Sequence, residues 1–216
     1  MSGVDWEVKQ FILPFSVLSE NRKETFTSDL EVAAVREYHL GQWEPMGMIF
    51  HGWAIAEQGD IQAGLEELQA GVSAMRATNF QALYTYFLAL QSDLYAKMGH
   101  IEEGISMLNQ ALNFTSSSEE RWYEAELHRR GGELQLQCGD EVEAENAWAR
   151  ALEIAQSQQV KTFALHAAVD LARLWHRQGH ADKAREVLAP IYYWFTEGFD
   201  TPDLIEAKKV LGRLDL

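Results

Sequence analysis

Cysteine is nearly absent from this sequence of 216 residues, which contains only Cys138. A single thiol cannot form a disulfide within the chain, and it excludes a zinc site built from several cysteines. No run of about 18 apolar residues occurs, and the N-terminus has neither a basic segment nor the apolar stretch of a secretory signal. We therefore expect a soluble cytoplasmic protein that does not enter a membrane.

Basic residues are also scarce. There are 18 Lys and Arg against 33 Asp and Glu, which gives a formal net charge of −15. A chain of this charge repels a phosphate backbone, so we expect no nucleic-acid partner. Four prolines and 15 glycines are too few for a disordered or collagen-like chain, and a hydrophobic content of 47% is enough to build a core.

The strongest positive signal is an internal repeat. Glycine recurs every 40 residues, at Gly59, Gly99, Gly139 and Gly179. A fixed period of this length is typical of a solenoid, in which each unit buries its apolar face against its neighbours. Each glycine suits the left-handed position after a helix, and Asp60 and Asp140 can cap the helices that follow.

Small and large apolar residues recur at fixed spacing within each period. They are Gly52/Gly64/Leu68/Gly71, Ser92/Gly104/Leu108/Ala111, Gly132/Ala144/Trp148/Ala151 and Ala172/Ala184/Leu188/Ile191. This spacing resembles the tetratricopeptide repeat, in which two antiparallel helices approach closely at the small positions. The resemblance predicts an all-α, right-handed superhelical array of about four helix pairs of 40 residues. Trp148 and Trp175 fall in columns predicted to be core.

The repeat frame also predicts where the helices lie. We expect them near 43–58, 61–78, 80–98, 101–114, 118–138, 141–158, 161–178 and 181–196. A Ser-x-x-Glu capping box from Ser117 to Glu120 would begin the helix at 118. Thr201 and Pro202 predict the start of a final helix, about 202–214, that caps the array. The chain then divides into a non-repeat segment 1–28, a repeat array 29–200 and a capping helix 201–216.

The first 28 residues fit no repeat, and residues 29–40 look like the second helix of a pair whose first helix is absent. An apolar cluster surrounds Pro14, which disfavours a single uninterrupted helix there. The segment is either an irregular cap over the first repeat or an element of self-association, because an uncapped solenoid end is adhesive. The sequence leaves both open, together with a homo-oligomer formed through this segment or the array ends.

Four stretches carry a closer resemblance, within a region that starts near Trp43. They are GWAIAEQG at 52–59, ERWYEAELHR at 120–129, ALEIA at 151–155 and WFTEGFDTPDL at 194–204. They are similar to the C-terminal tetratricopeptide region of large bacterial regulatory ATPases that often carry an adenylate or guanylate cyclase domain. The sequence has no Gly-x4-Gly-Lys-Ser/Thr motif, so the resemblance does not transfer these activities. It implies an interaction or sensing module in bacterial regulation or signalling.

Motifs for chemistry are weak. His176 and His180 have zinc-ligand spacing, but Gly179 interrupts the helix and His180 aligns with the turn positions of Asp60 and Asp140. No nucleophile, base and oxyanion donors can be assembled on the repeat frame. We predict no metal, no cofactor and no enzymatic activity.

In tetratricopeptide arrays the first helix of each pair lines a concave groove. Carried onto this frame, the predicted lining is Met46, Ile49, Trp53 and Glu57; Tyr86, Ala89, Asp93 and Lys97; Glu126, Arg129, Glu133 and Gln137; and His166, Val169, Arg173 and Arg177. An aromatic end and an arginine end suit a peptide with an apolar segment and a carboxylate. Alternatively, the arginines only balance acids on adjacent helices, at well under about 1 kcal/mol each when exposed.

We therefore predict a non-enzymatic scaffold that binds a protein or peptide in this groove. The second candidate is a ligand-responsive regulator, whose superhelix changes curvature when it binds a small signal or a peptide. Only the second predicts a ligand-dependent change in solution scattering.

Overall fold

The computed structural model describes residues 44–77, 82–118 and 120–214, and these residues form helices and turns without any strand among them. The helices are α3 (Glu44–Glu57), α4 (Ile61–Ala77), α5 (Tyr84–Lys97), α6 (Ile101–Ser117), α7 (Glu124–Gln137), α8 (Glu141–Ser157), α9 (Lys161–Arg177), α10 (Ala181–Tyr192) and α11 (Pro202–Leu214). The all-α class is confirmed. The predictions for residues 1–28 and 29–40 lie outside the described residues.

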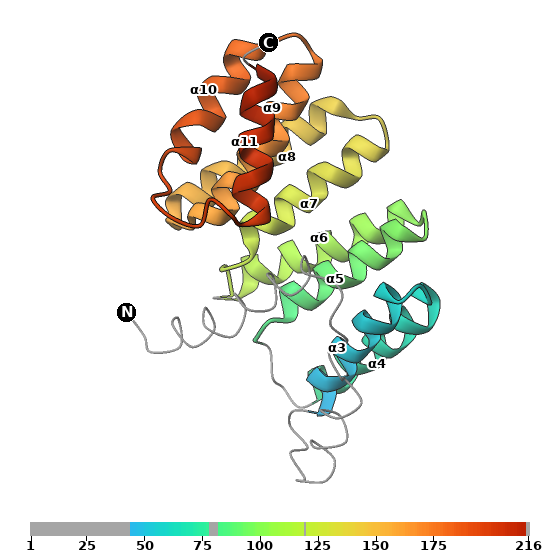
Figure 1. The fold of residues 1–216 in the computed structure, drawn as a ribbon. Coiled ribbons are helices and arrows are strands. Elements are labelled where there is room, and N and C mark those ends of the chain that lie inside the picture. The colour runs from blue at the N-terminus through green and yellow to red at the C-terminus, as the bar shows by residue number, and fades with distance from the viewer. Residues whose placement is uncertain (1–43, 78–81, 119, 215–216) are drawn as a thin grey trace.

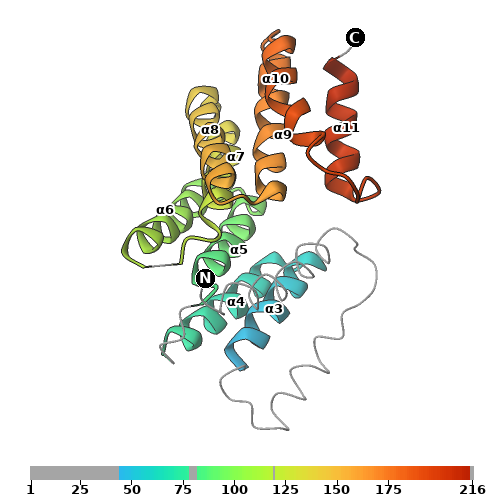
Figure 2. The same cartoon turned by 90° about the vertical axis from the view of Figure 1, so that its left-hand side faces the viewer.

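Consecutive helices form pairs that stack on one another (Figure 1). The first helices α3, α5, α7 and α9 contact one another in turn, and α11 packs on α9 and α10. We call α3, α5, α7, α9 and α11 the inner layer. Successive pairs turn relative to one another, so that α9, α10 and α11 run steeply across the direction of α5 and α6 (Figure 2).

The turn within each pair contains a glycine in the left-handed region, as the repeat predicted. The φ angles are +112° at Gly59, +80° at Gly99, +83° at Gly139 and +82° at Gly179. A side chain would be strained at such angles, which favours glycine. The two aspartates that follow act as caps, since Asp60 Oδ1 accepts from Ala63 N at 3.1 Å and Asp140 Oδ1 accepts from Glu143 N at 3.0 Å.

The two helices of a pair approach closely where a side chain is missing. A β-carbon on Gly52 would lie 2.5 Å from the main-chain nitrogen of Leu68, and one on Gly64 would lie 2.4 Å from the oxygen of Gly52. In the third pair, a β-carbon on Gly132 would lie 2.5 Å from Nε1 of Trp148. The predicted small columns are therefore contact points between helices.

Two hydrophobic clusters fill the array. One is built from α3 to α7, and the other from α7 to α11. The side chain of Phe163 packs against both, so the core continues from one repeat to the next. Trp148 and Trp175 are buried in the second cluster, as the column positions predicted.

Several predicted helix ends are wrong. The helices expected from 80 and 118 begin later, at Tyr84 and Glu124, and the one expected to reach 196 ends at Tyr192. The helix expected to stop at 114 continues to Ser117. The final helix, predicted at about 202–214, is α11.

The capping box predicted from Ser117 to Glu120 does not form. Ser117 is the last residue of α6, and its hydroxyl donates to carbonyls within that helix. Glu120 instead reaches back to α5, where its Oε1 accepts from the main-chain nitrogen of Thr85 at 3.2 Å and from the Thr85 hydroxyl at 2.7 Å. Leu83, which precedes α5, is left-handed at φ +67° and provides no side-chain cap, so a carboxylate from the following repeat caps this helix.

Candidate binding surface on the inner layer

The predicted groove residues divide into buried and accessible positions. Ile49, Ala89 and Val169 are 0%, 0% and 7% exposed, so the frame was wrong to place them in the groove lining. Ile49 faces the second helix of its own pair, since a β-carbon on Gly71 would lie 2.8 Å from Ile49 Cγ1. The repeat position that Ile49, Ala89 and Val169 share therefore belongs to the core wherever its residue is apolar.

The remaining predicted residues are accessible in most cases. Partly or fully exposed are Met46, Trp53, Glu57, Tyr86, Asp93, Lys97, Arg129, Glu133, Gln137, His166, Arg173 and Arg177. Glu126 is the exception, with 4% exposure.

Ion pairs cross from each inner helix to the next along this layer. They are Glu57–Lys97 between α3 and α5, Asp93–Arg130 between α5 and α7, Arg129–Asp170 between α7 and α9, and Arg173–Glu206 between α9 and α11. We call these four pairs the charge ladder. Each pair therefore joins an inner helix to the next one in the array.

A second set of charged contacts, centred on the buried Glu126, joins α7, α9 and α11 beside the ladder. The Glu126 carboxylate accepts from Arg129 Nε at 3.0 Å and lies 3.2 Å from Nδ1 of His166. On its other side, Nε2 of His166 lies 3.2 Å from Oδ2 of Asp203 in the first turn of α11. His166 therefore bridges two carboxylates that come from different helices.

These contacts determine the charge states of the cluster. Burial alone would raise the pKa of Glu126, but the charge of Arg129 and the contact with His166 outweigh it and hold this pKa well below its usual range. Burial alone would lower the pKa of His166, but its hydrogen bonds to Asp203 and Glu126 raise it to about 10. At neutral pH the cluster therefore consists of a protonated imidazole between two carboxylates.

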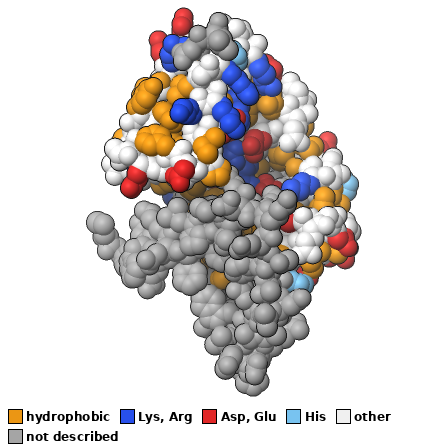
Figure 3. All heavy atoms as spheres, in the orientation of Figure 1, with side chains coloured by type: hydrophobic (Ala, Val, Ile, Leu, Met, Phe, Trp, Pro, Cys, Tyr) orange, Lys and Arg blue, Asp and Glu red, His pale blue; other side chains and the backbone are white. Residues whose placement is uncertain are grey.

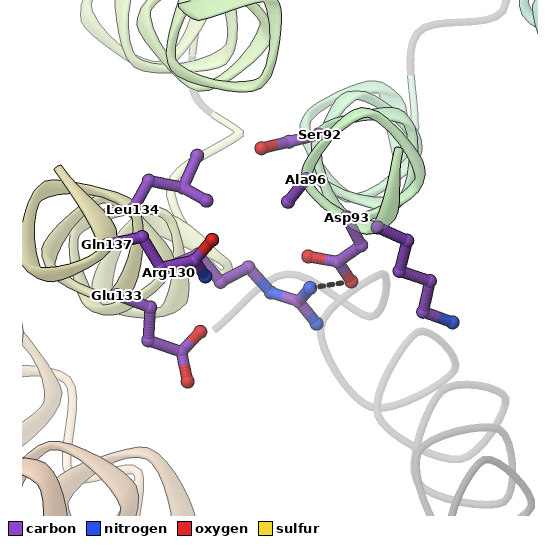
Figure 4. Close-up of a pocket in the computed structure, with 8 residues that line it drawn as sticks. Ser92, Asp93, Ala96, Arg130, Glu133, Leu134 and Gln137 are labelled. Atoms are coloured by element: carbon purple, nitrogen blue, oxygen red, sulfur yellow. Dashed lines mark hydrogen bonds and ion pairs between the residues drawn. The ribbon is translucent and has the colours of Figure 1, made fainter. Parts of the chain in front are cut away.

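A cavity of about 290 Å³ opens between α5 and α7. It is lined by Ser92, Asp93, Ala96 and Lys97 of α5 and by Arg130, Glu133, Leu134 and Gln137 of α7. Half of these residues belong to the predicted groove lining. The close-up shows the Arg130 side chain lying between the two helices, with its end toward Asp93 (Figure 4).

Arg130 is the functional candidate that the repeat frame missed. The frame assigned Arg129 to the groove and not Arg130, whose position in the repeat is occupied by Phe50 and Leu90 in the first two units. A charge in a column that begins as apolar is the signal that could have found it. The structure brings both arginines to the inner layer, with Arg129 directed to α9 and Arg130 to α5.

The predicted arginine end of the groove is largely paired within the chain. Arg129 is 14% exposed and contacts Glu126, Glu133 and Asp170. Arg173 pairs with Glu206 and is 45% exposed, while Arg177 is 53% exposed and lies 4.0 Å from Glu141. Lys and Arg side chains gather over the C-terminal helices beside acidic ones (Figure 3). The pairing of Arg129 and Arg173 is the arrangement that the charge-balance interpretation expects.

Aromatic side chains follow one another near the starts of α5, α7 and α9. Ring centroids lie 6.2 Å apart for Tyr86 and Trp122, 5.2 Å for Tyr86 and Tyr123, and 5.8 Å for Tyr123 and Phe163. We call these four residues the aromatic row. Tyr123 is buried, whereas the other three are partly exposed. The row places apolar surface beside the charge ladder.

Within the described part of the chain, no three His, Cys, Asp or Glu residues are grouped so as to hold a metal ion. His176 lies in the last turn of α9, and His180 precedes α10 across the turn. The helices of this part are all too short or too polar to cross a membrane.

Comparison with known proteins identifies the fold. No family model matches the chain. The chain is 31% identical over 156 residues to an uncharacterized protein of Rhizobium meliloti (strain 1021), and the match covers 69% of this chain but 15% of that much longer protein.

Among solved structures, the chain is similar to the TPR-like repeats of a kinesin light chain-type protein from Podospora anserina, with a TM-score of 0.61, 16% identity, and coverage of 80% of this chain and 86% of that one. The chain is also similar to BtubC from P. vanneervenii, with a TM-score of 0.54, 18% identity, and coverage of 88% of this chain and 90% of that one. For MamA the TM-score is 0.51 and the identity 11%, with coverage of 86% of this chain and 91% of that one. Identities this low establish the fold alone. The chain is a tetratricopeptide-like repeat solenoid, as the spacing predicted.

Proposed function

We propose that this chain is a non-enzymatic scaffold that binds a protein or peptide along the inner layer of the array. The observation that carries the proposal is the cavity between α5 and α7. It opens among residues that the repeat frame had assigned to the groove. Of the aromatic row, Tyr86 lies on α5, and Trp122 and Tyr123 directly precede α7. A surface that combines the aromatic row, the charge ladder and a polar cavity has the composition of a peptide-binding site.

The apolar part of a partner would contact the aromatic row together with Met46 and Trp53 of α3. Aromatic rings bury a large area with few rotatable bonds, so they act as anchors in interfaces. The charge ladder supports this role, because it joins the inner helices before a partner arrives and so reduces the ordering that binding requires.

The arginine end offers a second contact. Arg173 and Arg177 are the accessible guanidinium groups there, and a partner carboxylate would compete with Glu206 for Arg173. Arg177 is the better candidate for a new contact, because its pair with Glu141 is long, with 4.0 Å between Nη2 and Oε1. A role in bacterial regulation or signalling rests on the resemblance of the four stretches to regulatory ATPases and is part of this proposal.

The proposal is tested by selecting peptides from a random phage-displayed library on the intact chain and measuring their affinities by fluorescence anisotropy. We expect peptides whose affinity falls at least tenfold for Trp53→Ala or Tyr86→Ala. The matched control is Arg150→Ala, which removes a half-exposed side chain from the second helix α8 and should leave affinity unchanged. Selected peptides that bind all three variants as tightly as the parent chain would contradict an inner-layer site.

The carboxylate contact has its own test. For a selected peptide that contains an acidic residue or a free C-terminus, the Arg173→Ala, Arg177→Ala double variant should bind more weakly, with a smaller salt dependence. Equal affinity for the parent and the double variant would remove the carboxylate contact and leave the arginines as partners of Glu206 and Glu141.

A further inference from the structure

We propose that the segment between α10 and α11 binds a partner peptide that carries a Lys or Arg side chain next to an apolar one. We call residues 193–200 the aromatic segment. It contains none of the inner-layer residues of the proposed function, so it is a second interaction surface. Three features carry the inference: exposed rings that lie together, contacts that hold them, and two carboxylates without a counter-charge.

Exposed large apolar side chains gather at this end of the array. Of the five among the described residues, four lie in or just after the aromatic segment: Tyr193, Trp194, Phe199 and Ile205. The fifth, Val142, is on α8. Tyr193 is 75% exposed. Hydrophobic side chains lie on the surface over α10 and the segment after it, with acidic side chains beside them (Figure 3). Single exposed apolar residues are common, whereas a group of exposed rings indicates an interaction surface.

The exposed rings are held by their neighbours. The rings of Tyr193 and Phe199 both contact the buried ring of Tyr192 edge to face, with centroids 5.3 Å and 5.7 Å from it. Trp194 is held from α9, because Lys161 Nζ lies 4.8 Å from its ring centroid and donates to its carbonyl at 3.3 Å. Rings that are already fixed lose little freedom when a partner covers them, which favours binding.

The main chain of the segment is fixed as well. Gly198 is left-handed at φ +75°, and its carbonyl accepts from Thr201 N at 2.9 Å and from Thr201 Oγ1 at 2.7 Å. The carbonyl of Thr201 in turn accepts from Ile205 N of α11 at 3.0 Å. This turn joins the segment to α11, so Phe199 is presented from a defined backbone.

Two carboxylates belong to the same segment, those of Glu197 and Asp200. Both side chains are exposed, and within the described ranges neither takes part in an ion pair. A partner's Lys or Arg would therefore find a counter-charge without displacing one from the chain. The same side chain can place its cationic group over an exposed ring and its methylene groups along it.

Charge favours this partner over three others. A second copy of the chain would place the same carboxylates against one another, between molecules that each carry a net charge of −15. An anionic membrane surface is repelled for the same reason. An acidic or uncharged peptide could cover the rings, but it would remove water from Glu197 and Asp200 without supplying a counter-charge. A basic and apolar peptide satisfies both the rings and the carboxylates.

The test uses peptides selected from a random phage-displayed library on the intact chain, with affinities measured by fluorescence anisotropy. We expect a class of peptides with Lys or Arg next to an apolar residue. Their affinity should fall by at least about tenfold for the Tyr193→Ala, Phe199→Ala double variant and stay unchanged for Trp53→Ala. Val142→Ala removes an exposed apolar side chain from α8 and serves as the matched control, with no expected effect.

The charge contact is tested separately. The Glu197→Gln, Asp200→Asn double variant should bind these peptides at least about fivefold more weakly and with a smaller salt dependence. Replacing the Lys or Arg of the peptide by Gln should weaken binding to the parent chain but have little effect on this variant. The matched control is the Glu102→Gln, Glu103→Gln double variant, which removes two exposed carboxylates from α6 and should leave the affinity unchanged. Thermal unfolding verifies that each variant is folded.

The outcomes separate the two proposals. If every selected peptide depended on Trp53 or Tyr86 and none on the aromatic segment, this inference would be overturned and the proposed function would stand. Peptides that need Tyr193 and Phe199 but contain no Lys or Arg would also overturn it. Self-association in sedimentation velocity that the Tyr193→Ala, Phe199→Ala variant abolishes would identify a second copy as the occupant and overturn the peptide. Basic peptides that bind only the aromatic segment would support this inference and contradict the inner-layer site.

Discussion

The two adjacent glycines of α7 give the sharpest test of the packing described above. A β-carbon on Gly132 would lie 2.5 Å from Nε1 and 2.7 Å from Cδ1 of Trp148, whereas a β-carbon on Gly131 would have nothing within 4 Å. The Trp148 ring is buried, and its Nε1 donates to the carbonyl of Arg129 at 2.9 Å. The ring therefore cannot move aside freely, and Gly132→Ala must displace it.

The expected magnitude follows from these contacts. Overpacking a core costs about 1–3 kcal/mol, and loss of the Trp148 hydrogen bond adds about 0.5–1.5 kcal/mol. Replacing glycine by alanine within a helix is favourable by about 0.5–1 kcal/mol, and this gain is common to both positions. Gly131→Ala should therefore stabilise the chain slightly, and Gly132→Ala should be less stable than Gly131→Ala by about 1.5–4.5 kcal/mol.

The assay is urea denaturation followed by circular dichroism, with hydrogen exchange of α7 and α8 to locate the effect, because repeat arrays often do not unfold in two states. The corresponding position to Trp148 is leucine in the other pairs, and Ala172 coexists with Leu188 in the fourth. In a Trp148→Leu background, Gly132→Ala should therefore cost little. Equal stability of the two alanine variants, or a clash that persists beside leucine, would refute the reasoning.

Three further predictions concern polar contacts of buried or partly buried side chains. Glu120→Ala removes a cap of α5, so it should destabilise the chain by about 0.5–2 kcal/mol and speed hydrogen exchange at the Thr85 amide. Glu120→Gln should retain most of the stability. If neither variant changed the stability or the exchange rate, the capping role would be contradicted. The raised pKa of His166, about 10, means that its stabilisation is fully present below the unfolded value near 6.5 and is lost as pH rises through the folded value. The stability difference between the parent chain and His166→Gln, measured by urea titration, should therefore shrink between pH 6 and pH 10, and a difference that stays constant would contradict it. Arg129→Met leaves the buried Glu126 carboxylate without its main partner, so it should lower the free energy of unfolding by about 3–5 kcal/mol. Adding Glu126→Gln should recover part of this loss. If the stability losses of the two single variants simply added in the double variant, the coupling would be contradicted.

The repeat frame predicted the periodic features of the fold, because those features depend on local geometry. A left-handed turn needs glycine, and two closely packed helices need a small residue, so Gly59 and Gly52 are visible without coordinates. The prediction of a capping box at Ser117 was wrong because the Ser-x-x-Glu pattern is compatible with two arrangements of Glu120. The same Glu120 can cap its own helix or a helix of the preceding repeat, and only the packed array brings Thr85 within its reach.

The inner layer also combines features that the repeat frame predicted with features that only the packed structure decides. The frame identified the helices that build it, and most predicted lining residues are accessible there. It could not separate Ile49, which turns into the core, from Trp53 on the same helix, because their exposure depends on how neighbouring helices rotate. It also could not pair charges across repeats, and so it did not find the cavity beside Arg130.

The sequence by itself determined that this protein is an all-α array with a 40-residue period, followed by a helix that starts at Pro202. The period can be seen in the sequence alone, because each repeat needs the same type of residue at the same position. Only the tertiary structure decided which charges neutralise one another and which stay unpaired. Those outcomes depend on distances between side chains about 33 to 41 positions apart, such as Arg173 with Glu206 and Arg129 with Asp170, and spacing along the chain does not contain these distances.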